Sequence, residues 1–162
     1  MTSELPTTTS DWIALLEYET ELLEGLARAT IAARNASLRD SRDPFMALLD
    51  QQTNLCRRLE DSRRRRRQGL ARAGRPPGEM QDLVLETGDP ELQERAQKAL
   101  DRWFEAARAT QQENDLNREF YAVALATVEE AVSIITGSRT RGYDPRGRGV
   151  RAEGRAFVTT SI

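Results

Sequence analysis

The sequence predicts an all-α protein, in which an antiparallel helical hairpin packs on a long third helix. This body is an elongated three-helix bundle or coiled coil with a disordered C-terminal tail. Three observations predict it. Apolar residues recur at three- and four-residue steps along most of the chain, the spacing of one face of an α-helix. Aspartate-proline pairs at 43–44 and 89–90 mark helix starts. Charged residues make up 31% of the chain and apolar residues 38%, which favours solvated helices over a deep core.

The first helix is expected to run from Trp12 to about Leu38. Residues 9–11, Thr-Ser-Asp, offer oxygens that can cap the unpaired amide groups of its first turn. Leucine and alanine then follow the helical spacing, and glutamates lie on the other side. Gly25 interrupts this pattern at a cost of about 1 kcal/mol relative to alanine, so packing must hold that turn.

The second helix is expected to begin at Asp43-Pro44. The aspartate accepts the cap hydrogen bond, and a proline in the first turn lacks only a donor that would be unpaired there. An apolar stripe follows from Phe45 to Leu59, and Cys56 falls on it, where it is expected to be a small buried hydrophobe. About five polar residues separate the first two helices, so they should fold back as an antiparallel hairpin.

Beyond Leu59 the apolar stripe is expected to end in the arginine run Arg63–Arg67. Gly74 and the proline pair at 76–77 stop any helix. A weaker apolar pattern over Glu79 to Glu86 predicts one or two turns of helix.

The third long helix is expected to run from Pro90 to Thr136, because no proline or glycine interrupts this segment. At about 1.5 Å per residue it would measure roughly 70 Å. The hairpin cannot cover that length, so part of this helix should lack an intramolecular partner. Polar residues between Thr110 and Asn117 interrupt the apolar seam, which resumes at Phe120. The resumed seam fits either ordinary bundle core or a strip for an amphipathic partner helix, and one face could serve each purpose.

Several function classes are excluded by composition. Without histidine there can be no serine–histidine triad, no zincin motif and no Glu-x-x-His di-iron site. A single cysteine forms neither an intrachain disulfide nor a thiolate metal cage. Carboxylate pairs such as Glu17 and Glu21 lie on polar helix faces, and the sequence has no Gly-rich phosphate loop. We therefore expect no enzyme activity, no cofactor and no metal site.

The sequence also shows no stretch typical of a targeting signal. The first ten residues carry a glutamate and no basic residue, which is wrong for a secretory signal. The longest apolar run, Tyr121 to Ala126, is far short of the ~20 residues of a membrane span. We expect a cytoplasmic protein without membrane insertion, organised as a flexible N-terminus (1–9), a helical bundle domain (10–136) and a disordered Arg/Gly-rich tail (137–162).

Two arginine-rich zones, 51–75 and 137–162, stand against an otherwise acidic chain. The run Arg63–Arg67 could contact phosphates of nucleic acid or anionic lipid. Five successive helical residues point all around the axis, however, and at a helix C-terminus the backbone dipole favours them, so a structural role is the preferred interpretation. The tail segment Arg146–Gly149 lacks the repeated aromatics of a single-strand binder.

Two segments carry a resemblance to a known family. Asn114-Asp115-Leu116-Asn117-Arg118 opens an amphipathic run that reaches Ile135, and Gly142-Tyr143-Asp144-Pro145-Arg146-Gly147 follows it. Together they resemble the C-terminal half of the FlgN family, cytoplasmic chaperones of bacterial flagellar type III export. A leucine- and glutamate-rich first helix and a second helix that ends in Glu60-Asp61-Ser62-Arg63-Arg64 agree in outline.

The resemblance implies particular partners and sites. The clients would be the disordered C-terminal segments of the hook–filament junction proteins FlgK and FlgL, kept from premature assembly and delivered to the export gate. The gate partner would be the cytoplasmic domain of FlhA. The implied client-binding residues are Asn114, Asn117, Phe120, Tyr121, Leu125, Val128, Val132 and Ile135, and the implied gate-docking residues are Tyr143, Asp144 and Gly147. Pro145 and the arginines around it depart from the family pattern.

Two other function classes fit parts of the same pattern. An arginine-rich coiled-coil adaptor or nucleic-acid-binding protein would show binding that falls steeply with salt. A purely structural helical homodimer would self-associate through the long helix without any client.

Overall fold

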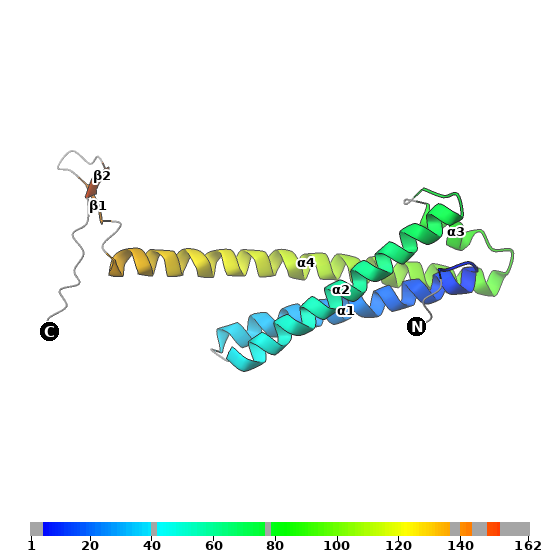
Figure 1. Ribbon diagram of the computed structural model, residues 1–162, viewed down its shortest axis with the longest axis horizontal. Helices are drawn as coiled ribbons and strands as arrows, with labels where there is room; N and C mark the ends of the chain where they lie inside the picture. Colours follow the sequence, from blue (N-terminus) through cyan, green and yellow to red (C-terminus); the bar gives the residue numbers. More distant parts are fainter. Residues whose placement is uncertain (1–4, 40–41, 77–78, 137–139, 144–148, 153–162) are drawn as a thin grey trace. The chain divides into compact units, whose positions relative to one another are not determined.

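The structure, a computed structural model, describes residues 5–39, 42–76, 79–136, 140–143 and 149–152. These residues form helices α1 (Thr9–Leu38), α2 (Arg42–Arg72), α3 (Met80–Leu85) and α4 (Pro90–Ile135), and strands β1 (Thr140–Tyr143) and β2 (Gly149–Ala152) (Figure 1). The predicted helical body is confirmed. The chain divides into two compact units, Met1–Asn117 and Arg118–Ile162, and the division falls within α4.

Helix α1 begins with a capping box one turn before the predicted start. Thr8 is the N-cap, and its hydroxyl oxygen accepts a hydrogen bond from the backbone N–H of Asp11 at 3.2 Å. The Asp11 carboxylate in turn accepts one from the backbone N–H of Thr8 at 2.9 Å. Pro6 is buried, so part of the segment expected to be flexible over 1–9 is ordered around this cap. The helix ends at Leu38, as predicted.

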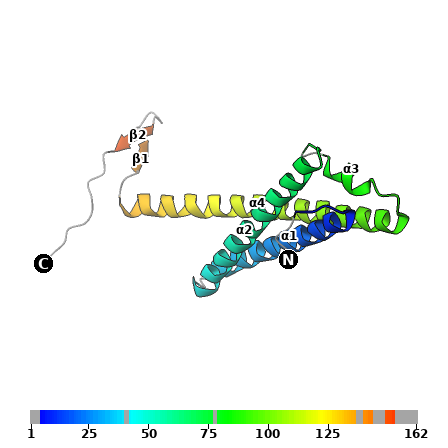
Figure 2. The same cartoon turned by 45° about the vertical axis from the view of Figure 1, so that its right-hand side comes forward.

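Helices α1 and α2 form the predicted antiparallel hairpin, side by side in Figures 1 and 2. Their contacts run in opposite directions along the two sequences. Gln52 donates to the Thr30 hydroxyl at 3.5 Å, and further along α2 the Ser62 hydroxyl donates to Glu19 at 3.1 Å. Leu59 is buried between these two contacts, against Leu22 and Leu23.

The expectation that the apolar stripe ends after Leu59 is wrong, because Leu70 further along the same helix is buried, whereas the helix stop predicted at Gly74 is confirmed. Helix α2 continues through the whole arginine run to Arg72, because Ser62, Gly69 and Leu70 carry on its buried face. It ends in a Schellman motif in which Gly74 adopts a φ of 69°. There the backbone N–H of Arg75 donates to the Leu70 carbonyl at 2.9 Å, and that of Gly74 donates to the Ala71 carbonyl.

Cys56 is exposed, which contradicts its predicted burial. The face of α2 that contacts α1 is narrow and passes through Leu55, Leu59 and Ser62. Cys56 follows Leu55 by one residue, about 100° further around the helix, and so lies outside that face.

Helix α4 begins at Pro90, as predicted, and the Asp89 carboxylate accepts a hydrogen bond from the backbone N–H of Glu91 at 3.0 Å. Its first half runs alongside α1 in the same direction (Figures 1 and 2). Arg95 contacts Glu17 near the start of both helices, and Thr110 contacts the Leu23 carbonyl further along. The short helix α3 closes one end of the core with buried Met80 and Val84.

The apolar core belongs entirely to the first unit. A larger cluster gathers the N-terminal half of α1, the end of α2, α3 and the start of α4; it contains Trp12, Ile13, Leu15, Leu16, Leu70, Met80, Val84, Ala96, Ala99 and Leu100. A smaller cluster holds Leu22, Leu23, Leu59 and Ala106. From residue 111 to residue 136, none is buried.

Strands β1 and β2 lie in the segment expected to be a disordered tail, and the sequence does not predict them. They pair antiparallel, with Thr140 opposite Ala152 and Tyr143 opposite Gly149. The rest of the predicted tail (137–139, 144–148 and 153–162) lies outside the described residues.

Candidate functional site

A buried carboxylate holds the first half of α4 in place. Glu19 of α1 has no exposed surface. One of its oxygens accepts a hydrogen bond from Trp103 Nε1 of α4 at 2.9 Å. The other accepts from Ser62 of α2 and lies 3.3 Å from Arg66 Nε. The Arg66 guanidinium also lies 5.1 Å from the Trp103 ring centroid, a cation–π distance. One carboxylate therefore joins three helices.

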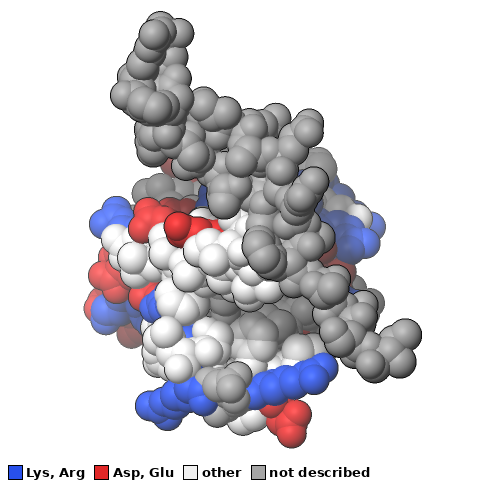
Figure 3. All heavy atoms as spheres, turned by 90° about the vertical axis from the view of Figure 1, so that its left-hand side faces the viewer, with Lys and Arg blue, Asp and Glu red and all other residues white. Residues whose placement is uncertain are grey.

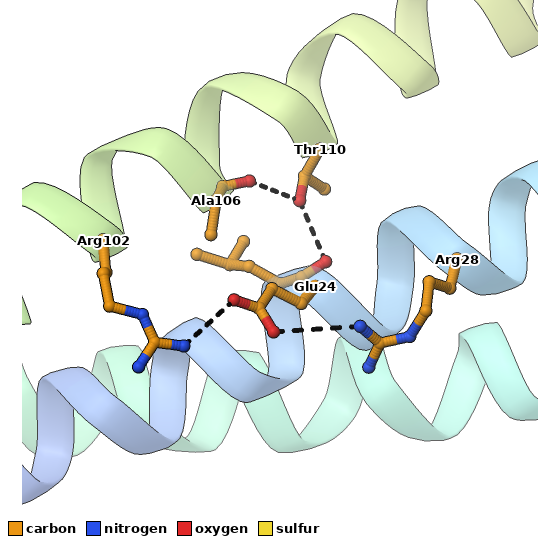
Figure 4. A network of polar contacts seen from close by, with 6 residues as sticks. Glu24, Arg28, Arg102, Ala106 and Thr110 are labelled. Atoms are coloured by element: carbon orange, nitrogen blue, oxygen red, sulfur yellow. Dashed lines mark hydrogen bonds and ion pairs between the residues drawn. The ribbon is translucent and has the colours of Figure 1, made fainter.

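A second polar network secures the next turns of the same interface (Figure 4). The Glu24 carboxylate lies between Arg28 of its own helix, at 3.8 Å, and Arg102 of α4, at 3.4 Å. Thr110 is buried, and its hydroxyl lies 3.0 Å from the Leu23 carbonyl and 2.7 Å from the Ala106 carbonyl. Further along, Arg34 pairs with Glu113 at 2.8 Å. These contacts hold the first half of α4 against α1.

The second half of α4 differs, because most of its apolar side chains are exposed, although Phe120 and Tyr121 are partly buried. Val128 is 58% exposed, Val132 51% and Ile135 78%. None of the described residues from 118 to 136 is buried. Figure 3 shows exposed uncharged side chains between acidic and basic ones on the face that it presents. The prediction that part of this helix carries apolar side chains without an intramolecular cover agrees with these exposures.

Helical spacing sorts these apolar residues into two stripes. The first apolar stripe consists of Tyr121, Leu125, Val128, Val132 and Ile135. The second apolar stripe consists of Phe120, Val123 and Ile134, roughly 130° away around the helix. The Phe120 and Tyr121 rings meet edge to face at 5.1 Å, where the two stripes begin.

The opposite face of this half helix is polar and acidic. It carries Glu119, Glu129 and Glu130 together with the small residues Ala122, Ala126 and Ser133. An amphipathic helix with a broad exposed apolar side and a charged back is suited to receiving an apolar partner segment.

The two asparagines predicted to contribute to this surface, Asn114 and Asn117, both belong to the first unit. Asn114 is exposed. Asn117 is partly buried, and its side-chain oxygen has no hydrogen-bond partner among the residues that the structure describes. A buried acceptor without a partner costs free energy, so this oxygen favours a donor from outside the chain.

The predicted gate-docking residues can be placed only in part. Tyr143 is the last residue of β1. Asp144 and Gly147 lie outside the described residues. The site residues in α4 and those in the tail both belong to the region in which the sequence resembles one family.

Comparison with known proteins decides the family. A family model described as FlgN protein matches residues 1–150, which is most of the chain. This chain belongs to the FlgN family. The FlgN family is a family of flagellar export chaperones rather than of enzymes, so membership supports a role as a flagellar export chaperone for this chain. Searches of curated proteins and of solved structures gave no match.

Two further findings concern membrane spans and metal sites. No helix in the described part of this FlgN protein is both long and apolar enough to span a membrane. Within the same residues, no group of three or more potential metal ligands comes together.

The Glu19 network is the part of the structure that sequence reasoning missed. Glu19 stands among the glutamates of α1, and Arg66 stands inside the arginine run, so neither differs from its neighbours in type. The available signal was spacing. Glu19 follows Leu15 and Leu16 by four and three residues, and Arg66 follows Ser62 by four residues and Leu59 by seven, which is two helical turns.

Proposed function

We propose that this FlgN-family chaperone binds the disordered C-terminal segments of the hook–filament junction proteins FlgK and FlgL through the second half of α4. The observation that carries the proposal is the exposure of the first apolar stripe. The proposed client-binding residues are Asn114, Asn117, Phe120, Tyr121, Leu125, Val128, Val132 and Ile135.

The physical basis is a surplus of apolar surface on one helix. Burying an apolar side chain contributes roughly 25 cal/mol per Å² of surface removed from water, so the exposed stripe supplies an attraction. A client tail that is disordered when free loses conformational entropy on binding, which lowers the net affinity and allows release. Client residues covered in this way are not available for assembly in the cytoplasm.

The proposed delivery step uses the tail. Tyr143, with Asp144 and Gly147, would dock on the cytoplasmic domain of the export-gate protein FlhA. A handle in the tail, separate in sequence from the α4 stripe, would allow the gate to be engaged while the client stays bound.

The test of the client site is a pair of matched double variants. Val128→Asp with Val132→Asp places two charges in the first apolar stripe. Ala122→Asp with Ala126→Asp places the same two charges, at the same spacing, on the polar back of the helix. Calorimetric titration with FlgK and FlgL C-terminal peptides should show binding to the wild type and to the Ala122/Ala126 variant only.

Circular dichroism of both variants checks that α4 is still helical. Equal binding by the two variants would refute the client site. For the gate, Tyr143→Ala and a chain ending at Ser138 should both weaken binding to the FlhA domain without changing client affinity. Unchanged gate binding by either of them would refute the tail handle.

A further inference from the structure

The arginine run of α2 contains two guanidinium groups that the fold does not use. Arg58 contacts the Tyr18 hydroxyl, Arg64 pairs with Asp61, and Arg66 is held by Glu19 and Trp103. Arg63 and Arg67, by contrast, make no ion pair or hydrogen bond with any residue that the structure describes. They are one helical turn apart, where two like charges repel each other.

Both side chains line a depression of about 340 Å³ on the surface of the first unit. Its other lining residues are Glu60, Arg66 and Leu70. Leu70 is almost completely buried and gives the depression an apolar floor. Arg66 is oriented by its ion pair with Glu19, and its guanidinium also donates to the Met80 sulfur at 3.7 Å. Because Glu19 compensates the charge of Arg66, Arg63 and Arg67 supply the uncompensated positive charge.

We propose that this depression binds an acidic peptide segment of a protein partner. Two neighbouring guanidinium groups can each donate two hydrogen bonds to a carboxylate, and a bound carboxylate would relieve their mutual repulsion. An apolar side chain of the same segment would pack on Leu70. From Glu60 to Leu70 the helix rises roughly 15 Å, a length that a short peptide segment can span.

The lining favours a peptide over a nucleic acid. Glu60 stands at one end of the depression, where its carboxylate would repel a run of phosphates. Among the residues that the structure describes, no aromatic side chain lines the depression, so these residues offer no stacking platform for bases. A peptide of mixed composition tolerates Glu60, because a lysine or backbone N–H can meet it. This site is on α2 and is independent of the proposed client stripe on α4.

The test uses the full-length chain and defined probes. The first probe is a dye-labelled peptide of glutamate and leucine, about twelve residues long, and the second has lysine in place of glutamate. The third is a single-stranded oligonucleotide with the same number of negative charges as the first. Fluorescence anisotropy should show binding of the glutamate peptide, no binding of the lysine peptide, and weaker binding of the oligonucleotide.

Two charge-reversal variants locate the site. Arg63→Glu with Arg67→Glu should weaken binding of the glutamate peptide by about tenfold or more, the loss expected when hydrogen bonds to charged groups are removed. Arg57→Glu with Arg64→Glu makes the same charge change at residues of α2 that do not line the depression, and it should leave the affinity within about twofold. Glu60→Gln should strengthen binding.

Circular dichroism checks folding, and Arg63→Gln with Arg67→Gln replaces the charge reversal if that variant does not fold. Equal losses in the two charge-reversal variants would overturn the proposal, because they indicate attraction by net charge alone. Absence of peptide binding, or tighter binding of the oligonucleotide, would also overturn it. Retention of peptide binding by the variant Val128→Asp with Val132→Asp separates this site from the client stripe.

Discussion

At the scale of single residues, the buried Glu19 carboxylate of α1 contacts both α2 and α4 and so holds the three helices together. A carboxylate with no exposed surface is stable only when its charge is paired and its oxygens accept hydrogen bonds. Ser62, Arg66 and Trp103 meet both requirements. The same carboxylate orients the Arg66 guanidinium over the Trp103 ring, so its removal would affect contacts of α1 with both α2 and α4.

Glu19→Ala is therefore expected to destabilise the protein by about 3–5 kcal/mol, because the mostly buried Arg66 loses its counter-charge. Urea unfolding followed by circular dichroism measures the change. The control is Glu17→Ala, which is in the same helix as Glu19. It removes an exposed ion pair with Arg95 of α4 and should cost less than about 1 kcal/mol. If the two variants lost similar free energies of unfolding, the Glu19 network would contribute no more to stability than an exposed ion pair.

Asp11 gives a pH-dependent contribution. Hydrogen bonds from the backbone N–H groups of Thr8 and Thr7, and from the Thr8 side chain, lower the pKa of this carboxyl from 3.8 to about 2. Because the folded-state pKa is depressed, the ionised cap stabilises the fold above the unfolded-state pKa, and the stabilisation is lost as the pH falls toward 2.

The wild type should therefore be more stable than Asp11→Ala at neutral pH, and the difference should shrink as the pH falls below about 4. Urea midpoints of both proteins at several pH values measure this. Asp61→Ala removes an exposed carboxylate within α2 that caps no helix and serves as the control. A wild-type advantage over Asp11→Ala that stays constant down to pH 2 would contradict the role of the cap.

At the scale of helices, two glycines face different surroundings on the α1–α2 hairpin. A Cβ atom added to Gly69 of α2 would lie 2.9 Å from Pro6 and 2.9 Å from the Trp12 ring. A Cβ atom added to Gly25 of α1 would lie 3.5 Å from Leu55, which is ordinary contact. Gly69 is thus required by close packing, whereas Gly25 is not.

The same substitution should consequently have opposite effects at the two sites. Gly69→Ala is expected to destabilise the protein by about 1–3 kcal/mol through overpacking against the buried Trp12 ring. Gly25→Ala is expected to stabilise it by up to about 1 kcal/mol, because alanine is the better helix former. Thermal and urea unfolding of the two variants provide the comparison, and a shift of the same sign in both would contradict this account of the packing.

How well the sequence predicts each helix depends on whether the core positions of that helix are apolar or polar. The start of α4 at Pro90 was predictable from its Asp-Pro pair, and the start of α2 was predicted to within two residues in the same way, since α2 begins at Arg42 rather than at Pro44. The end of α1 at Leu38 followed from the end of its apolar spacing. The extension of α2 was not, because polar Ser62 and Arg66 occupy its core face and their partner, Glu19, is 43 residues or more away in the sequence. Cys56 was wrongly predicted because leucine spacing defines a wider stripe than the contact with α1 uses.

The first apolar stripe was predictable for a different reason. Val128, Val132 and Ile135 keep a helical apolar spacing in a segment that the hairpin is too short to cover, and their exposure in the structure agrees with this. Spacing alone could not separate Arg63 and Arg67 from the other arginines of α2. That distinction required the positions of Glu19, Asp61 and Tyr18, which belong to the folded structure.

At the scale of the whole molecule, the buried core and the proposed client-binding surface lie in different parts of the chain. Within the described residues up to 136, every buried residue precedes Asn117, where the first unit ends. The exposed apolar stripe belongs to the second unit. Loss of the second unit should therefore remove function without removing the core.

A chain that ends at Asn117 should keep the urea midpoint of the full-length protein within error, because it retains both apolar clusters and the Glu19 network. It should bind neither FlgK nor FlgL C-terminal peptides in calorimetric titration, because the first apolar stripe is missing. The full-length variant Val128→Asp with Val132→Asp is the control, since it loses the same binding without truncation. A lower midpoint for the truncated chain would mean that the second unit contributes to the core, and residual client binding would place the client site on the first unit.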